Sequence, residues 1–373
     1  MVKRWTALLA IALLTAGSLL AQMPADSVLR RYAAGMLMVG FRGDSVTDDC
    51  DAARYVRDLH VGAIVLFDVD LTSGTHDIGT RNVTSKERLT HMTSQLQDWA
   101  DYPLFITLDQ EGGKVARLKP EYGYRPTVTA QHLGETDNED TTRHYAALIA
   151  REMAESGINL NLAPVVDVLN PQSPALAKYE RCYSAMPKVV ARHAGWFIDE
   201  HHRQGVLCTL KHFPGHGNAV TDSHYGFVDV TGTWGRYELE PFAALIRQGK
   251  ADVIMTAHIF NRNIDDQYPA TLSHKTLTGI LRQQLGYDGV IVTDDLYMDA
   301  ILANYSIPQA LELAINAGAD LLCVGNNINT GYEADRPFLL VDMIVDLVKQ
   351  GRIPWQRLQE SHDRLMRLAQ KLK

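Results

Sequence analysis

The sequence predicts an α/β protein folded as a single (β/α)8 barrel of the TIM type. Two observations predict this fold: eight short apolar runs recur along the chain, and segments with helical periodicity lie between most of them. Runs that are apolar at every position, rather than at every second one, are typical of parallel strands covered on both faces. Eight such strands with intervening helices fit a closed barrel. A doubly wound open sheet is the rival fold that the same alternation allows.

The expected strands are the eight apolar runs. They lie at residues 34–41, 61–67, 103–109, 158–167, 206–213, 251–258, 288–294 and 319–325. The expected helices are segments whose apolar residues recur every three to four positions. They lie at 85–100, 138–157, 187–205, 235–249, 274–286 and 306–318, with two more at 336–351 and 355–372 after the last strand. Strand–helix alternation of this kind favours βαβ units.

The first 22 residues have the pattern of a secretory signal peptide. Lys3 and Arg4 precede an apolar run from Thr6 to Ala21, and the polar sequence QMPADS follows. The run is shorter than the ~20 apolar residues that a membrane-spanning helix needs, although an uncleaved anchor is the competing interpretation. We expect residues 1–22 to be removed and the barrel domain to occupy 23–373. The mature protein is then periplasmic or extracellular, with no stable membrane insertion.

Charge and cysteine content argue against two other classes of protein. The chain has 36 Lys and Arg against 44 Asp and Glu, a formal net charge of −8, which disfavours a nucleic-acid partner held through phosphates. Cys50, Cys182, Cys208 and Cys323 form no C-x-x-C pair and show no zinc-site spacing. We assign no disulfide and no metal, and expect Cys208 and Cys323 to be buried free thiols because they lie in apolar runs.

Polar side chains stand at the carboxyl ends of the expected strands. They are Asp109, Asp167, Lys211, His212, His258 and Asp294. In a parallel barrel these ends meet at one rim, where the loops form the active site. Any one of these residues could be a structural ion pair, but a set of polar groups on one rim predicts a polar binding pocket.

The segment KHFPGHGNAVTDSH, residues 211–224, contains a candidate for proton transfer. Asp222 and His224 are two positions apart on a loop, so the carboxylate can hold one imidazole nitrogen while the other faces a substrate. A solvated surface turn is the competing structural interpretation. A phosphate cradle is disfavoured because the segment lacks the G-K-[ST] ending of a P-loop.

The segment GVIVTDDLYMDA, residues 289–300, supplies a second candidate group. Asp294 leaves the expected strand into the rim, where it can act as a carboxylate nucleophile or as an electrostatic partner. We expect the neighbouring Asp295 to face the barrel exterior or to cap the next turn.

These motifs together resemble a known family. DQEGGKVARL, KHFPGHG followed after four residues by DSH, VIVTDDLYM and NAGADLLCVGNN occur in this order between about residue 30 and the end of the chain. In this combination the sequence is similar to glycoside hydrolase family 3, in its β-N-acetylglucosaminidase branch with a histidine-containing acid/base loop. The resemblance implies a (β/α)8 barrel, a retaining double displacement and no cofactor. We expect no residues to be left for the sandwich domain that many members carry.

The resemblance also implies roles for individual residues. Asp294 matches the nucleophile, and His224, oriented by Asp222, matches the general acid/base. The positions that match the sugar-binding site are Asp109, Arg117, Arg181, Lys211 and His212, with His258 as a further lining position. Two residues depart from the family pattern: Lys114 stands where Arg is common, and Asn218 stands where Asp is familiar. Neither departure touches the proposed catalytic groups.

Glycoside cleavage needs a nucleophile on one face of the sugar and a proton donor at the leaving oxygen, and an imidazole already titrates near neutral pH. Because a neutral imidazole does not repel an anion, phosphorolysis stays open beside hydrolysis. A non-catalytic sugar-binding barrel and a metal-dependent barrel hydrolase compete with the glycosidase interpretation, but the first expected strand lacks the H-x-H that the metal-dependent class usually has. The expected substrate is terminal β-linked N-acetylglucosamine in peptidoglycan fragments (muropeptides) or chitin-type oligosaccharides, attacked in exo fashion. The oligomeric state is not predicted.

Overall fold

The computed structural model describes residues 23–73, 77–220, 228–328 and 331–372. The predicted signal peptide, Asp222 and His224 lie outside the described residues. All eight predicted strands are present. They are β1 (Leu37–Val39), β2 (Ala63–Val65), β3 (Phe105–Leu108), β6 (Leu160–Asn161), β7 (Leu207–Phe213), β9 (Val253–Thr256), β11 (Val290–Val292) and β12 (Leu322–Val324).

These eight strands form one parallel sheet that closes into a barrel. Their order is β11-β9-β7-β6-β3-β2-β1-β12, so each strand lies beside its neighbours in the chain. The two ends of the sheet meet where Val292 pairs in parallel with Leu321, immediately before β12. The (β/α)8 prediction is therefore confirmed, and the open-sheet interpretation is wrong.

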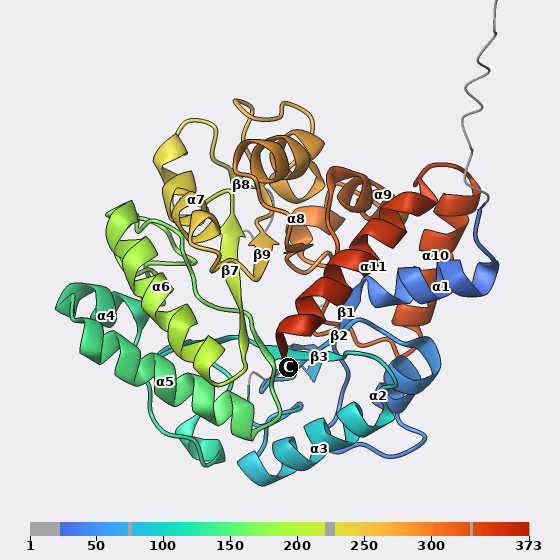
Figure 1. The fold of residues 1–373 in the computed structure, drawn as a ribbon, viewed down its shortest axis with the longest axis horizontal. Coiled ribbons are helices and arrows are strands. Elements are labelled where there is room, and N and C mark those ends of the chain that lie inside the picture. The colour runs from blue at the N-terminus through green and yellow to red at the C-terminus, as the bar shows by residue number, and fades with distance from the viewer. Residues whose placement is uncertain (1–22, 74–76, 221–227, 329–330, 373) are drawn as a thin grey trace, which may run out of the picture.

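The predicted helices surround the barrel (Figure 1). They are observed as α3 (Lys86–Trp99), α5 (Glu139–Glu155), α6 (Pro187–Arg203), η5 (Arg236–Leu239) with α7 (Glu240–Arg247), the π-helix η7 (Lys275–Gln284), α9 (Ile307–Ala317), α10 (Arg336–Lys349) and α11 (Trp355–Ala369) with η8 (Gln370–Leu372). Polar residues fix several of their starts: Ser85 and Asn138 accept hydrogen bonds from the N–H groups of Arg88 and Thr141.

The structure also contains elements that the sequence did not predict. They are α1 (Asp26–Gly35), α2 (Asp51–Ala53), η1 (Arg54–Leu59), η2 (Leu71–Ser73), β4 (Gln110–Gly112), β5 (Val115–Ala116), η3 (Pro120–Tyr122), α4 (Ala130–Thr136), β8 (Val228–Asp229), β10 (Ile259–Phe260), η6 (Ala270–Leu272) and α8 (Asp299–Leu302). The first strand begins later than the apolar run at 34, because Ala34 and Gly35 complete α1.

Helix α11 closes the amino-terminal end of the barrel, and its last turn lies over the middle of the sheet (Figure 1). Leu365 and Leu368 pack with residues that fill the barrel interior, such as Met38 and Phe105. Arg357 Nη2 lies 2.6 Å from Oδ1 of the buried Asp320, which immediately precedes the strand region of β12. The predicted site lies at the other end of the barrel, which the carboxyl ends of the strands form and which α11 does not cover.

Cys50, Cys182, Cys208 and Cys323 carry free thiols, and Cys208 and Cys323 are buried as expected. Within the described ranges, no helix combines the length and the apolar character needed to cross a membrane.

Candidate active site

Five of the predicted site residues lie in one cluster at the carboxyl ends of β3 and β7. Lys211 is only 1% exposed, and its Nζ lies 2.7 Å from Asp109 Oδ1. Arg117 donates from Nη2 to the other carboxylate oxygen, Asp109 Oδ2, at 3.0 Å. Arg181 Nη2 lies 3.5 Å from His212 Nε2. The cluster places cationic donors beside carboxylate acceptors, a combination suited to a ligand with many hydroxyl groups.

Glu111 joins the two halves of this cluster, although it was not among the residues predicted from the sequence. Arg181 binds it with two parallel hydrogen bonds, from Nε to Oε2 at 2.8 Å and from Nη2 to Oε1 at 2.7 Å. Lys211 Nζ lies 2.8 Å from the same Oε1. A bidentate guanidinium–carboxylate pair fixes the orientation of both groups. The signal for Glu111 was its place two residues after Asp109 in DQEGG.

A hairpin of β4 and β5 brings Glu111 and Arg117 to the cluster. Gln110 Oε1 accepts hydrogen bonds from the backbone N–H of Arg117 at 2.8 Å and of Leu118 at 2.9 Å. The turn requires glycine at Gly113, where φ is +58° and a Cβ would lie 2.4 Å from Thr129 Cγ2. The sequence DQEGGKVARL therefore sets the local fold as well as the charged groups.

Opposite charges keep the carboxylates of the partly exposed Asp109 and the buried Glu111 ionised. Burial alone would raise the pKa of Asp109, but Lys211 and Arg117 together hold it well below its usual range. Burial also opposes ionisation of Glu111, and Arg181 and Lys211 outweigh it and lower the pKa. The pKa of Lys211 is raised despite burial because Asp109 and Glu111 face it. These three groups are therefore charged at neutral pH.

Asp167 orients His212 from the exit of β6. Its Oδ2 lies 2.7 Å from His212 Nδ1, and its Oδ1 accepts from the backbone N–H of His216 at 2.7 Å. Asp167 is fully buried; burial opposes its ionisation, but His212 and the backbone hydrogen bonds lower its pKa. Because Asp167 accepts at Nδ1, the Nε2 edge of His212 faces Arg181 and the cluster.

Asp294 lies just beyond Thr293, the residue that follows β11, at the same end of the barrel. Its Oδ1 accepts a hydrogen bond from the backbone N–H of Asp295 at 2.9 Å. Asp295 accepts from the N–H of Tyr297 at 2.9 Å, so the prediction that it caps the next turn is confirmed. His258, predicted to line the site, is buried after β9, with its Nε2 2.9 Å from the carbonyl oxygen of Asp295.

The segment that leads to Asp222 and His224 is held by Asn218. Asn218 Nδ2 donates to Glu238 Oε1 at 2.8 Å, and Asn218 Oδ1 accepts from Asn170 at 2.8 Å. Glu238 is fully buried. The amide at position 218, where the family often has Asp, thus supplies a donor that a carboxylate would lack. The other departure, Lys114, pairs with Glu180 at 2.5 Å.

Among the His, Cys, Asp and Glu side chains of the described ranges, no group of three or more is arranged to hold a metal ion.

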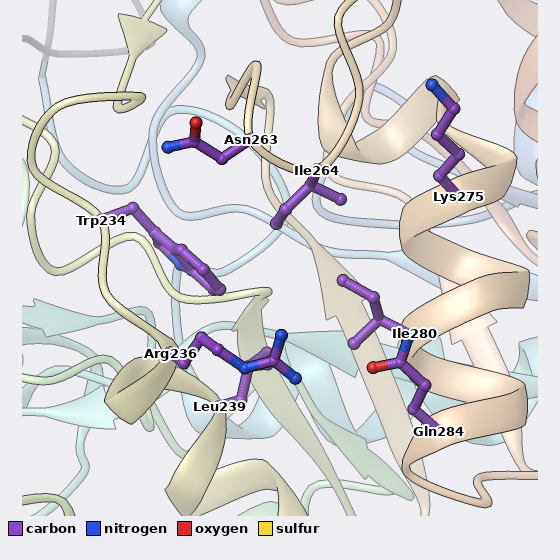
Figure 2. A pocket seen from close by; sticks show the side chains of 8 residues that line it. All are labelled: Trp234, Arg236, Leu239, Asn263, Ile264, Lys275, Ile280 and Gln284. Carbon is purple, nitrogen blue, oxygen red and sulfur yellow. The ribbon is translucent and has the colours of Figure 1, made fainter.

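A separate cleft of about 440 Å³ opens between the segment before α7 and the π-helix η7. Figure 2 shows Trp234 and Arg236 on one side and Ile280 and Gln284 on the other. The cleft shares no lining residue with the cluster around Lys211. The paired carboxylates, lysine and arginines of the cluster around Lys211 lie outside this cleft. We therefore take the cluster, and not the cleft, as the candidate active site.

The chain matches the model of the glycosyl hydrolase family 3 N-terminal domain over residues 28–368. A beta-hexosaminidase of Tolumonas auensis is 33% identical over 296 residues, which cover 79% of this chain and 83% of that protein. A beta-hexosaminidase of Idiomarina loihiensis is 35% identical over 255 residues, which cover 66% and 75% of the two chains.

Solved structures agree with this match. A family 3 β-N-acetylglucosaminidase from Paenibacillus sp. superposes with a TM-score of 0.82 at 33% identity, over 92% of this chain. This chain spans only 62% of the Paenibacillus protein. A β-N-acetylhexosaminidase from Beutenbergia cavernae superposes with a TM-score of 0.79 at 26% identity, covering 92% of this chain and 98% of the other. From the model match and these relatives, the chain belongs to glycosyl hydrolase family 3.

Proposed function

We propose that the chain is an exported, retaining exo-β-N-acetylglucosaminidase that removes terminal β-linked N-acetylglucosamine from peptidoglycan fragments or chitin-type oligosaccharides. The observation that carries the proposal is the Asp109–Lys211–Glu111–Arg181 cluster at the same barrel end as Asp294. A fixed set of donors and acceptors beside a carboxylate suits a sugar held by its hydroxyl groups. The names of the relatives, beta-hexosaminidase and β-N-acetylglucosaminidase, support the same activity.

In the proposed first step, an Asp294 carboxylate oxygen attacks the anomeric carbon. The bond from this carbon to the leaving oxygen breaks, and His224 gives its proton to that oxygen, so a glycosyl ester of Asp294 forms and the aglycone leaves. In the second step His224 takes a proton from water, and the water oxygen bonds to the anomeric carbon. The ester bond breaks, which restores the Asp294 carboxylate and releases the sugar with retained configuration. Asp222 keeps the imidazole oriented through both proton transfers.

The cluster around Lys211 has a positioning role in this scheme. Lys211 and Arg117 are held on Asp109, and Arg181 is held on Glu111, so their donors are fixed before a sugar arrives. Preorganised donors lose little entropy on binding, and they place the anomeric carbon relative to the nucleophile. His212, oriented by Asp167, adds one more polar edge.

Product analysis tests the proposed reaction. The purified chain is incubated with N,N′-diacetylchitobiose, chitotriose and a GlcNAc-containing disaccharide muropeptide, each with and without inorganic phosphate. We expect free N-acetylglucosamine from the non-reducing end, first formed as the β-anomer, in both conditions. Sugar 1-phosphate formed only with phosphate would identify a phosphorylase, and no release from any substrate or from an aryl β-GlcNAc would identify a binding barrel.

Export is the second part of the proposal, and it rests on the Lys3–Ala21 sequence pattern. Expression of the full chain in a bacterial host, followed by fractionation and intact-mass measurement, tests it. The expected product is periplasmic or secreted and lacks about 22 residues. A full-length product in the membrane fraction would instead identify an uncleaved anchor.

A further inference from the structure

Asp295, the residue after the proposed nucleophile, is held at each of its polar groups. Its N–H donates to Asp294 Oδ1 at 2.9 Å, and its carbonyl oxygen lies 2.9 Å from His258 Nε2. Its side-chain oxygens accept from the backbone N–H groups of Tyr297 at 2.9 Å and Gly325 at 3.0 Å. The peptide that contacts the Asp294 carboxylate is therefore fixed from four directions.

These contacts tie the turn after β11 to both neighbouring strands. His258 follows β9, which pairs with β11 on one side, and Gly325 follows β12, which meets β11 on the other side. The Gly325 backbone can approach because it has no side chain: a Cβ there would lie 2.9 Å from Asp295 Oδ2 and 2.8 Å from Phe67 Cζ. The turn thus depends on both adjacent strand exits for its position.

The hydrogen-bond partners of His258 determine which of its ring nitrogens carries a proton. A carbonyl oxygen only accepts, so Nε2 carries the proton that binds Asp295. The other nitrogen, Nδ1, lies 2.8 Å from Thr271 Oγ1, and the Thr271 hydroxyl donates to the carbonyl oxygen of Ala257 at 2.9 Å. His258 is 2% exposed, so its ring has little room to turn away. Thr271 therefore fixes the imidazole that fixes Asp295.

Burial raises the pKa of Asp295 to about 6, and the N–H donors of Tyr297 and Gly325 oppose this rise. At neutral pH the side chain is mostly ionised and accepts both hydrogen bonds. An amide at this position presents one oxygen and one NH2 group, and the NH2 group would face a backbone N–H.

From these contacts we propose that His258 and Asp295 are positioning residues, which hold the Asp294 carboxylate at the angle needed for attack on the anomeric carbon. This inference rests on the proposed role of Asp294 as nucleophile. His258 acts through the Asp295 carbonyl and Asp295 acts through its own N–H, so neither forms or breaks a bond in the reaction. Near-attack geometry tolerates little displacement, so loosening this turn slows the bond-forming step more than it weakens sugar binding.

The test is the rate of covalent trapping by a 2-deoxy-2-fluoro glycoside with an activated leaving group, which needs no acid assistance. The variants are His258→Leu, Asp295→Asn and the conservative His258→Gln, whose amide can still donate to the Asp295 carbonyl. We expect His258→Leu and Asp295→Asn to lower the first-order trapping rate at least about tenfold while apparent reagent binding changes less than about threefold. His258→Gln should recover part of the rate.

His193→Leu is the matched control for loss of a buried histidine. His193 is fully buried on α6, and its nitrogens lie 2.9 Å from Thr142 Oγ1 and from Asp137 Oδ1. The His193→Leu variant should be less stable than the wild-type protein, and its trapping rate should be unchanged. If His258→Leu does not fold, the trapping rates of Asp295→Asn and His258→Gln still test the positioning role.

The outcomes separate this inference from the proposed function. If the wild-type protein is trapped on another carboxylate, the nucleophile assignment fails. If it is trapped on Asp294 but the folded His258 and Asp295 variants react at the wild-type rate, or lose rate only in proportion to reagent binding, the positioning role is wrong.

Discussion

Lys211 Nζ lies 2.7 Å from Asp109 Oδ1 although the two residues are 102 positions apart in the chain. The contact joins the exits of β3 and β7, and a third group, Glu111, lies 2.8 Å from the same Nζ. Lys211 is therefore the cation shared by the partly exposed Asp109 and the buried Glu111. Its role in stability can be measured separately from its role with substrate.

Lys211→Met should destabilise the fold by about 3 kcal/mol at pH 7, because it removes the cation shared by Asp109 and the buried Glu111, although Arg117 and Arg181 stay paired with them. Urea unfolding measures this loss. Lys86→Met is the control: Lys86 pairs with Glu155 on the surface, and the change should cost about 1 kcal/mol or less.

The pH dependence of this loss has a defined sign. The folded-state pKa values of Asp109 and Glu111 are lowered, so their stabilisation is complete above the ordinary carboxyl pKa and is lost as the pH falls through the folded values. The deficit of Lys211→Met should therefore stay constant from pH 7 down to the ordinary carboxyl pKa and shrink below it, between about pH 4 and about pH 2. A deficit that stays constant over this range would mean that lost packing, not lost charge pairing, is responsible.

Glu238 makes the free energy of unfolding depend on pH in the opposite direction. It is fully buried, and burial raises its pKa to about 7. Above the ordinary glutamate pKa of about 4.3, the folded chain keeps a proton that the unfolded chain has lost, so the free energy of unfolding falls by about 3 kcal/mol up to pH 7. Glu238→Gln removes this dependence while still accepting from Asn218.

We therefore expect Glu238→Gln to gain about 2–3 kcal/mol relative to the wild-type protein between pH 5 and pH 8. Urea unfolding at both pH values measures the gain, and Glu240→Gln on the exposed start of α7 serves as the control without such a gain. A parallel response of Glu238→Gln and the wild-type protein would show that Glu238 is ionised throughout.

His224→Ala should depend on the leaving group. With an alkyl or sugar aglycone we expect a loss of about 100-fold or more, because the leaving oxygen then lacks its proton donor. With an activated aryl oxide, the step that forms the glycosyl-enzyme should be much less affected. Pre-steady-state release of the aryl oxide measures that step, and an equal loss with both substrates would assign His224 a structural role.

Much of the fold could be predicted because its signals are local. Each parallel strand is a continuous apolar run, and each polar strand exit follows such a run directly, as Asp109 and Asp294 do. Glu111 was missed because its importance comes from Arg181, which is 70 positions away. The cover formed by α11 was missed for the same reason, since Arg357 and Asp320 pair only in the folded chain.

His258 shows what the structure adds to the resemblance. The resemblance predicts a residue that lines the sugar site, and in the structure one ring nitrogen lies on the Asp295 carbonyl and the other beside Thr271. No sequence signal links His258 to residues 13 and 37 positions away. These two contacts form only when the barrel folds and brings the three residues together, so they could not be predicted from the sequence.

Covalent labelling tests the assignment of Asp294 as the nucleophile most directly. The protein is incubated with an activated 2-deoxy-2-fluoro β-glycoside, digested and analysed by mass spectrometry for the labelled residue. We expect one label per active site, on the Asp294 carboxylate, and neither label nor turnover in Asp294→Ala. A label on another carboxylate, or full turnover by Asp294→Ala, would contradict the assignment.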